Sequence, residues 1–212
     1  MQYNPDMHHR PFDRVQGRRS IRLRNRDYSR AGAYFITLCV ENREHLFGDV
    51  VDGEMRLNEP GKWADECISV LPQRFPDLFV DTHVIMPNHV HMVVVIRDAR
   101  IGGTAVGAIH ELPLRELPVR YSPPLESPLI DPEIRRLTRR AMLIPKMIGY
   151  YRMNVAKRIN QIRGTPGVPV WQRNYYERII RDDDELNRVR KYIRNNPGKW
   201  SLDSENPNKD VG

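Results

Sequence analysis

Residues 83–96 constrain the fold of this chain more than any other stretch. They read His-Val-Ile-Met-Pro-Asn-His-Val-His-Met-Val-Val-Val-Ile, two β-forming runs separated by Pro87 and Asn88. Two turn-forming residues between such runs predict a tight hairpin. Successive side chains of a strand point to opposite faces of a sheet. One face of the second strand should therefore carry four side chains: His89, His91, Val93 and Val95.

Two imidazoles side by side on an apolar strand fit a metal site better than a core. Neutral imidazole donates a lone pair, and neighbours on one strand face can converge on one cation. The alternative is a pair of solvated or hydrogen-bonded histidines. A two-residue loop places Met86 opposite His89 and His83 opposite Met92, so His83 falls on the other face. We exclude His83 as a ligand unless the register slips by one residue.

Length and charge limit the class of protein. With 212 residues and 40% hydrophobic content, the chain can bury one proper core. A formal net charge of +7, carried mainly by clustered arginines, favours a polyanionic partner, with a merely soluble basic protein as the alternative. The two cysteines, Cys39 and Cys67, indicate reduced buried thiols rather than a disulfide framework. The absence of a long apolar run predicts a cytoplasmic protein with no membrane partner, nucleoid-associated when bound to DNA.

The N-terminal segment, residues 1–32, is polar and basic. Eight arginines lie between positions 10 and 30, against Asp13 and Asp27. The segment lacks the apolar periodicity needed to fold alone, so we interpret it as a flexible arm that contacts phosphates, with a plain disordered tail as the alternative. The arginines expected to bind DNA are Arg18, Arg19, Arg22 and Arg24.

The remaining chain alternates strands and helices. Strands are expected at residues 33–40, in the hairpin at 50–57 and 83–96, and at 168–180; helices at about 60–71, 133–162 and from 182 to Pro197. Trp63, Cys67 and Val70 should form the buried stripe of the first helix, with Pro72 as its end. Proline- and glycine-rich residues 98–132 indicate an insertion, either a binding lid or a tolerated loop. This pattern predicts an α+β domain over 33–202, with helices against one antiparallel sheet, and a polar tail at 203–212.

The final helix offers a second set of polar groups. Leu186, Val189 and Ile193 should form its buried stripe. At about 100° per residue, Tyr192 and Asn196 lie one turn apart on the flank of that stripe. Alternatively, Tyr192 is a boundary aromatic and Asn196 a cap before Pro197. Side chains expected to meet phosphates or bases lie on this helix and on the two preceding elements: Arg152, Arg173, Tyr176, Arg188, Lys191 and Arg194.

Three motifs resemble those of the single-tyrosine HUH transposases, insertion-sequence-200-like proteins, and specifically their REP-associated tyrosine transposase branch. They are Met-Pro-Asn-His-Val-His at 86–91, Val-Trp-Gln-Arg-Asn-Tyr-Tyr-Glu at 170–177 and Tyr-Ile-Arg-Asn-Asn-Pro at 192–197, in the family's order. The resemblance covers about residues 30–200 without the insertion. It implies a ferredoxin-like antiparallel sheet with helices on one face, plus a C-terminal helix carrying the catalytic tyrosine.

The resemblance also implies an activity, that of a single-strand DNA endonuclease and strand-transferase acting at hairpin-associated sites. Its nucleophile would be Tyr192, and its divalent ion, Mg²⁺ or Mn²⁺, would bind His89, His91 and Asn196. In some relatives the third ligand is a glutamine, whose side chain is longer than that of Asn196. The alternatives are a non-catalytic DNA-binding protein and a structural metal site. Both a homodimer and a monomer agree with the resemblance. Rival tyrosines at 150, 151, 175 and 176, with Trp171, are expected to pack or to stack on bases, and Glu177 to be a surface carboxylate or a base.

Overall fold

The computed structural model describes residues 31–97 and 142–207. The arginine arm to residue 30 and the insertion from residue 98 therefore lie outside the described residues. The main sheet consists of four antiparallel strands in the order β4-β5-β1-β6. Its strands are β1 (Gly32–Cys39), β4 (Leu78–Met86), β5 (His89–Ile96) and β6 (Tyr176–Ile180). With helices between them, this order is that of a ferredoxin-like α+β fold, as the sequence predicts.

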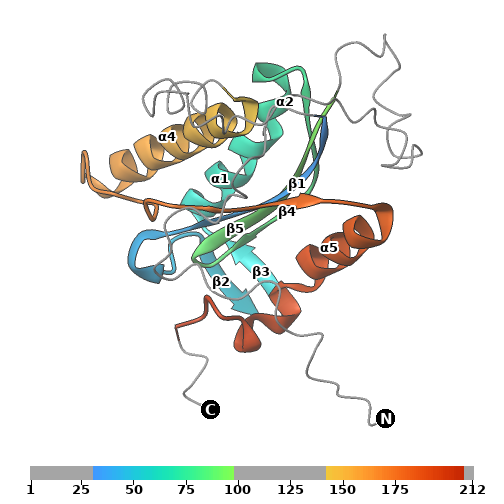
Figure 1. The fold of residues 1–212 in the computed structure, drawn as a ribbon. Coiled ribbons are helices and arrows are strands. Elements are labelled where there is room, and N and C mark those ends of the chain that lie inside the picture. The colour runs from blue at the N-terminus through green and yellow to red at the C-terminus, as the bar shows by residue number, and fades with distance from the viewer. Residues whose placement is uncertain (1–30, 98–141, 208–212) are drawn as a thin grey trace, which may run out of the picture.

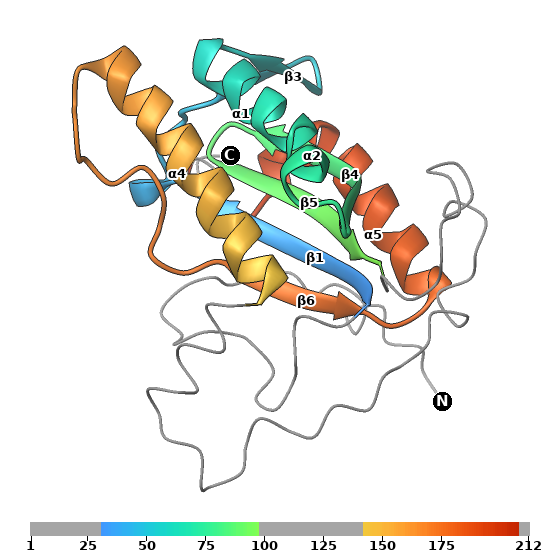
Figure 2. The same ribbon diagram turned by 90° about the horizontal axis from the view of Figure 1, so that it is seen from above.

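Helices cover both faces of this sheet (Figure 1). Helices α1 (Glu59–Ser69) and α4 (Leu143–Arg163) lie on one face, and the C-terminal helix α5 (Asp183–Asn195) lies on the other. Viewed from above, α4 and α1 cross the sheet while α5 is seen behind β4 and β5 (Figure 2). Short elements complete the fold: η2 (Glu41–Arg43), α2 (Leu71–Arg74) and η5 (Pro197–Leu202).

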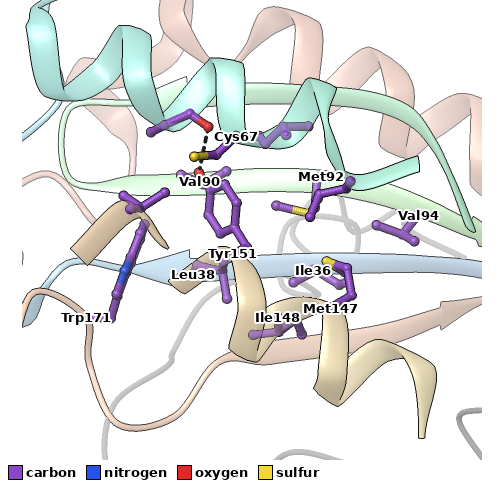
Figure 3. Close-up of a cluster of buried hydrophobic side chains, with 14 of the residues drawn as sticks. Ile36, Leu38, Cys67, Val90, Met92, Val94, Met147, Ile148, Tyr151 and Trp171 are labelled. Atoms are coloured by element: carbon purple, nitrogen blue, oxygen red, sulfur yellow. Dashed lines mark hydrogen bonds between the residues drawn. The ribbon is translucent and has the colours of Figure 1, made fainter. Parts of the chain in front are cut away.

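The larger core lies between the sheet and helices α1 and α4. Ile36, Val90 and Met92 of the sheet meet Met147 and Tyr151 of α4 (Figure 3). The buried hydroxyl of Tyr151 donates a hydrogen bond to the Ala64 carbonyl at 3.2 Å. This bond satisfies the one polar atom that the ring brings into an apolar layer, so α4 is tied to α1 without an unpaired buried donor.

A smaller core lies on the α5 face. Phe35, Val93 and Val95 from the sheet pack against the stripe predicted for α5, which consists of Leu186, Val189 and Ile193. The N-cap of this helix is Asp182, whose side chain accepts a hydrogen bond from the Glu185 backbone amide. The carboxylates of its first turn complement the positive end of the helix dipole.

The strand pair β2 (Gly48–Val51) and β3 (Glu54–Leu57) forms a separate two-stranded sheet, as its Asp-Gly turn predicts. Asp52 and Gly53 both have positive φ, 56° and 78°. That backbone conformation matches the right-handed twist of the paired strands, and glycine adopts it without steric cost.

Three expectations for individual elements are wrong. The buried side of α1 consists of Ala64, Cys67 and Ile68, whereas Trp63 and Val70 are exposed. Pro72 does not end helical structure, because it occupies the first turn of α2, where a missing backbone donor costs nothing. Strand structure predicted over 168–180 is confined to β6, and before it only Trp171 forms a bridge, with Val40.

Candidate metal and tyrosine site

The hairpin of β4 and β5 presents both predicted histidines on the α5 face. Its register pairs Met86 with His89 and His83 with Met92, as the two-residue loop requires. His83 therefore points to the opposite face, where its Nε2 lies 2.8 Å from the Asp65 carboxylate on α1. This confirms the geometric reason for excluding His83 from the histidine pair.

The His89 ring is fully buried, and its tautomer is fixed by Asn88. The Asn88 amide nitrogen donates to two backbone carbonyls, those of Arg43 and Glu205. Its side-chain oxygen must then be the atom that faces His89 Nδ1, at 2.9 Å. An oxygen acceptor requires Nδ1 to carry the proton, so Nε2 of His89 holds the free lone pair. That Nε2 is buried without a hydrogen-bond partner among the described residues.

His91 lies next to His89, with ring centroids 4.5 Å apart. Its Nδ1 is 2.8 Å from the hydroxyl of Thr37 on β1, and its Nε2 is 3.2 Å from the hydroxyl of Tyr192 on α5. In the tautomer that leaves Nε2 as an acceptor, Nδ1 donates to Thr37 and Nε2 accepts from Tyr192. Since Nε2 has one lone pair, a cation at this atom and the Tyr192 hydroxyl compete for it.

Tyr192 reaches His91 because α5 packs on the histidine face. Its ring contacts Phe35 edge-on, at a centroid distance of 6.1 Å, and lies 5.3 Å from the His91 ring. The buried stripe of α5 sets this position, because Tyr192 adjoins Ile193, which is completely buried. The phenol of the last helix and the imidazoles of the hairpin therefore share one site.

The chain beyond α5 returns to the same site. Asn196 is buried, and its amide nitrogen donates to the Asp203 carboxylate at 3.2 Å. The Asn196 side-chain oxygen is buried without a partner among the described residues. Asp203 follows η5, and its carboxylate, with one ring nitrogen from each histidine, forms a group of ligand atoms within 4.8 Å of one another: His89, His91 and Asp203.

Hydrogen bonds fix Asp203 in this position. The other carboxylate oxygen of Asp203 accepts from the Glu205 backbone amide at 2.7 Å, and the Glu205 carbonyl accepts from Asn88 at 2.7 Å. The Glu205 carboxylate also lies 3.4 Å from Arg43. Residues 203–205, expected to begin a polar tail, thus contribute to the site.

Burial keeps both imidazoles neutral. It lowers the pKa of His89 from 6.5 to about 3, with a further contribution from the positive charge of Arg43. Burial also lowers the pKa of His91 well below its usual range, with His89 acting in the same direction and Asp203 opposing it. Neutral imidazoles are the form that binds metal ions.

The donor set fits a divalent cation. Two buried acceptors, Nε2 of His89 and the side-chain oxygen of Asn196, have no hydrogen-bond partner within the described ranges. A buried lone pair without a donor is costly, and a cation at this point would satisfy it. Two nitrogens with carboxylate and amide oxygens suit Mn²⁺, and the oxygens also suit Mg²⁺.

One curated relative covers nearly the whole chain. It is an uncharacterized protein from Haemophilus influenzae, 34% identical over 201 residues, which are 95% of this chain and 95% of the relative. The chain belongs to the same family as this Haemophilus influenzae protein. No family model matches the sequence.

Two solved structures are also similar. One is a REP-associated tyrosine transposase bound to a REP hairpin, with a TM-score of 0.44, 16% identity and coverage of 85% of this chain and 74% of that one. The other is a proposed transposase from Deinococcus radiodurans, with a TM-score of 0.36, 14% identity and coverage of 82% and 97%. Because both TM-scores are below 0.5, the fold assignment depends on this chain's own strand order.

The residues that the sequence predicts to bind DNA have different environments in the structure. Four of them lie outside the described residues: Arg18, Arg19, Arg22 and Arg24. Arg188, Lys191 and Arg194 are exposed on α5, and Tyr176 lies on the histidine face, where it pairs with Thr37 across the sheet. Arg173 is exposed in the segment before β6, whereas Arg152 on α4 donates to the carbonyls of Gln172 and Arg173.

Apart from Tyr176, the rival aromatic residues and Glu177 lie away from the histidines. Glu177 is buried, not a surface carboxylate, and its strand position opposite Ile36 turns it to the α4 face. Tyr150, Tyr151, Tyr175 and Trp171 belong to the larger core or pack against it.

No described helix is both long enough and apolar enough to span a bilayer.

Sequence reasoning missed three residues of the site. Thr37 gave no signal, because a threonine within an apolar strand is ordinary for a sheet. Asn88 was assigned only to the turn, although its side chain fixes His89. Asp203 is followed by polar residues without periodicity, so only the fold brings its carboxylate to the histidines.

Proposed function

We propose that this protein is a metal-dependent single-strand DNA endonuclease and strand-transferase of the HUH type, with Tyr192 as nucleophile. The observation that carries the proposal is the 3.2 Å contact between the Tyr192 hydroxyl and Nε2 of His91. A phenol, two neutral imidazoles and a carboxylate share this site. The motif resemblance at 86–91 and 192–197 assigns Tyr192 and the two histidines independently of this geometry, whereas the Asp203 carboxylate comes from the structure alone.

Four side chains would hold the ion: His89, His91, Asp203 and Asn196. A bound Mg²⁺ or Mn²⁺ would act as a Lewis acid that draws charge from a phosphoryl oxygen. Asn88 and Thr37 orient the imidazoles for this task by bonding their Nδ1 atoms. Partners of this kind set both the tautomer and the direction of a histidine ligand.

The chemical step exchanges one phosphodiester for another. The Tyr192 oxygen attacks the phosphorus in line, a bond from phosphorus to tyrosine forms, and the bond to the 3′ oxygen breaks. The phenol loses its proton and the departing oxygen gains one as a 3′-hydroxyl. The product is a 5′-phosphotyrosyl link of similar energy, so a second 3′-hydroxyl reverses the step on another strand without ATP.

Substrate binding is assigned to basic and aromatic side chains around Tyr192. Arg188, Lys191 and Arg194 are exposed on the helix that carries the nucleophile, and Tyr176 offers a ring on the histidine face. Cations contact phosphates, and aromatic rings stack on unpaired bases. The arginines of the N-terminal arm would extend this contact along a single strand or a hairpin.

A covalent adduct on single-stranded DNA tests the proposal. The probe is an oligonucleotide containing a hairpin from the flanks of the protein's own gene, labelled at either end and incubated with Mn²⁺ or Mg²⁺. A 3′ label should become SDS-resistant on the protein, whereas a 5′ label should leave as a fragment ending in a 3′-hydroxyl. Peptide mapping should place the link at Tyr192.

Three controls make the test specific. Tyr192→Phe and EDTA should abolish the adduct, while Tyr150→Phe, altered on the opposite face where Tyr150 contacts Phe75, should retain it. DNA binding without any adduct would instead favour a non-catalytic DNA-binding protein. If the wild type has no nuclease activity and His89→Ala sharply lowers the melting temperature, the result would favour a structural metal site.

A further inference from the structure

Helix α5 forms ion pairs with both outer strands of the sheet, one on each flank of the helix. The buried apolar stripe of α5 lies between the two flanks and faces the sheet. At about 100° per residue, Glu185 and Tyr192 lie only about 20° apart around the helix axis, two turns from each other. Arg190 lies about 160° from Tyr192, on the other flank.

The first ion pair joins α5 to β6. Glu185 is buried, and its carboxylate pairs with the guanidinium of Arg178 on β6. The second carboxylate oxygen accepts from the Arg181 backbone amide at 2.9 Å. Both oxygens are therefore engaged, which holds the first turn of the helix against this edge of the sheet.

The second ion pair joins α5 to β4, at the opposite edge. The Arg190 guanidinium donates to both carboxylate oxygens of Asp81, through Nε at 2.8 Å and through Nη2. The Asp81 side chain is 4% exposed. The pairing of β4 with β5 skips Asp81, because Val80 pairs with Val94 and Thr82 with Val93. Asp81 is thus the extra residue of a β-bulge, a device that redirects a side chain.

We infer that the Asp81–Arg190 ion pair is a positioning device that sets the rotation of α5 about its axis and thereby places the Tyr192 hydroxyl at His91. Apolar packing along the stripe resists separation of the helix from the sheet but resists rolling less, since it is not directional. Planar bidentate pairing fixes direction. With Glu185 held on one flank and Arg190 on the other, rolling in either direction breaks an ion pair.

The size of the effect follows from helix dimensions. The tip of a side chain lies about 6 Å from the helix axis, so a roll of about 20° moves it by about 2 Å. Such a shift removes the 3.2 Å contact between Tyr192 and His91. A misplacement of about 1 Å in a reacting group lowers rates by about 100-fold. The kinetic part of this inference rests on the proposed nuclease function, whereas the positional part does not.

Stability alone does not explain the pair. Replacing both partners of a buried ion pair by apolar residues of similar volume is often neutral or stabilising, whereas removing one partner leaves an unpaired charge. The double variant Asp81→Leu/Arg190→Met therefore separates position from stability. Arg190→Lys keeps the positive charge but loses the planar guanidinium that bonds both carboxylate oxygens of Asp81. It serves as the second variant if the double variant does not fold. Arg163→Met, which breaks the exposed Arg163–Glu44 pair of α4, is the matched control.

Histidine ¹⁵N spectra of the metal-free protein give a readout independent of nuclease activity. Tyr192→Phe calibrates the shift of the His91 Nε2 resonance on loss of its contact with the phenol. Asp81→Leu/Arg190→Met should move this resonance toward the Tyr192→Phe position at an unchanged melting temperature, and Arg163→Met should leave it at the wild-type position. A wild-type His91 resonance in a folded double variant overturns the inference.

Single-turnover adduct formation gives the kinetic readout. The double variant should form the adduct about 100-fold more slowly, while Arg163→Met should match the wild type. A wild-type rate of adduct formation in Arg190→Lys would show that a positive charge at this position suffices. It would overturn the role of the bidentate guanidinium–carboxylate pairing. If the wild type forms no adduct, the proposed function fails, and the histidine spectra still decide whether the ion pair positions Tyr192.

Discussion

The hydroxyl oxygen of Tyr192 lies 3.2 Å from Nε2 of His91, although 101 residues separate them in the chain. The contact depends on α5 packing on the sheet face that carries the histidines. Had α5 joined α1 and α4 on the other face, the phenol and the imidazoles would be separated by the sheet. The choice of face therefore creates the candidate site.

Competition for the His91 lone pair gives the first prediction. Removing the phenol hydroxyl in Tyr192→Phe frees Nε2, so Mn²⁺ should bind up to about 5-fold tighter, equivalent to one hydrogen bond of about 1 kcal/mol. Calorimetric titration of both proteins measures the difference. Weaker binding in the variant would mean that the hydroxyl itself assists the cation and would contradict this competition.

Metal binding should stabilise the fold. Mn²⁺ at about 100 times its Kd should raise the free energy of unfolding by about 3 kcal/mol in the wild type. The gain should disappear in His89→Ala and fall strongly in Asp203→Ala, because each removes a ligand atom of the cluster. His83→Gln, altered on the opposite face, should keep the gain. Thermal denaturation with and without EDTA measures it, and an Asp203→Ala protein that behaves as wild type excludes this carboxylate as a ligand.

Asn88 should control metal affinity without touching the cation. Its oxygen holds the proton on Nδ1 of His89, so Asn88→Ala allows the other tautomer and a free ring orientation. We expect affinity for Mn²⁺ to fall by about 10–100-fold. Thr37→Val removes the corresponding partner of His91 and should act in the same direction. Unchanged affinity in both variants would show that packing alone orients the rings.

The buried imidazoles should make the metal-free protein sensitive to acid. The folded-state pKa of His89 is about 3, below the unfolded value of 6.5. Between these values the unfolded chain binds a proton that the folded protein rejects, so stability falls as pH decreases from about 6.5 toward 3. The slope should approach about 1.4 kcal/mol per pH unit for each such imidazole. Urea unfolding of wild type and His89→Leu at several pH values should show a shallower slope in the variant; equal slopes would refute the assignment.

Exposed cations on α5 should contribute to DNA affinity through salt release. Each phosphate contact adds about −0.7 to the slope of log affinity against log salt for single strands. Arg188→Ala and Arg194→Ala should each make the slope shallower by about that amount, while Arg163→Ala on α4 should not. Fluorescence anisotropy with a labelled oligonucleotide from 50 to 200 mM salt is the measurement. Identical slopes in all the proteins would place the DNA elsewhere.

Local sequence predicts much of this fold because hydrogen-bond register and side-chain alternation are short-range. Pro87 and Asn88 fix the hairpin, and with it the pairing of Met86 with His89 and the opposite direction of His83. Asp182 predicts the start of α5 as its N-cap. The strand-and-helix order likewise predicts the α+β class. Each of these inferences spans only a few residues of chain.

Expectations fail where packing between distant elements decides. The Trp63 ring meets the Arg158 guanidinium of α4 at the surface, at 5.8 Å, so the apolar residue expected in the α1 stripe is not in the core. Residues 168–175 are rich in β formers, yet only Trp171 pairs there, because a strand needs a neighbour along its whole length.

The sequence by itself determined the hairpin, the shared face of His89 and His91, and the helix that carries Tyr192, because these follow from the two-residue period of a strand and the turn of a helix. Only the tertiary structure decided that α5 covers the histidine face and that Asp203 returns to it. That decision depends on burying Leu186, Val189 and Ile193 against Phe35, Val93 and Val95. Such burial is non-directional, so no local pattern specifies the partner surface.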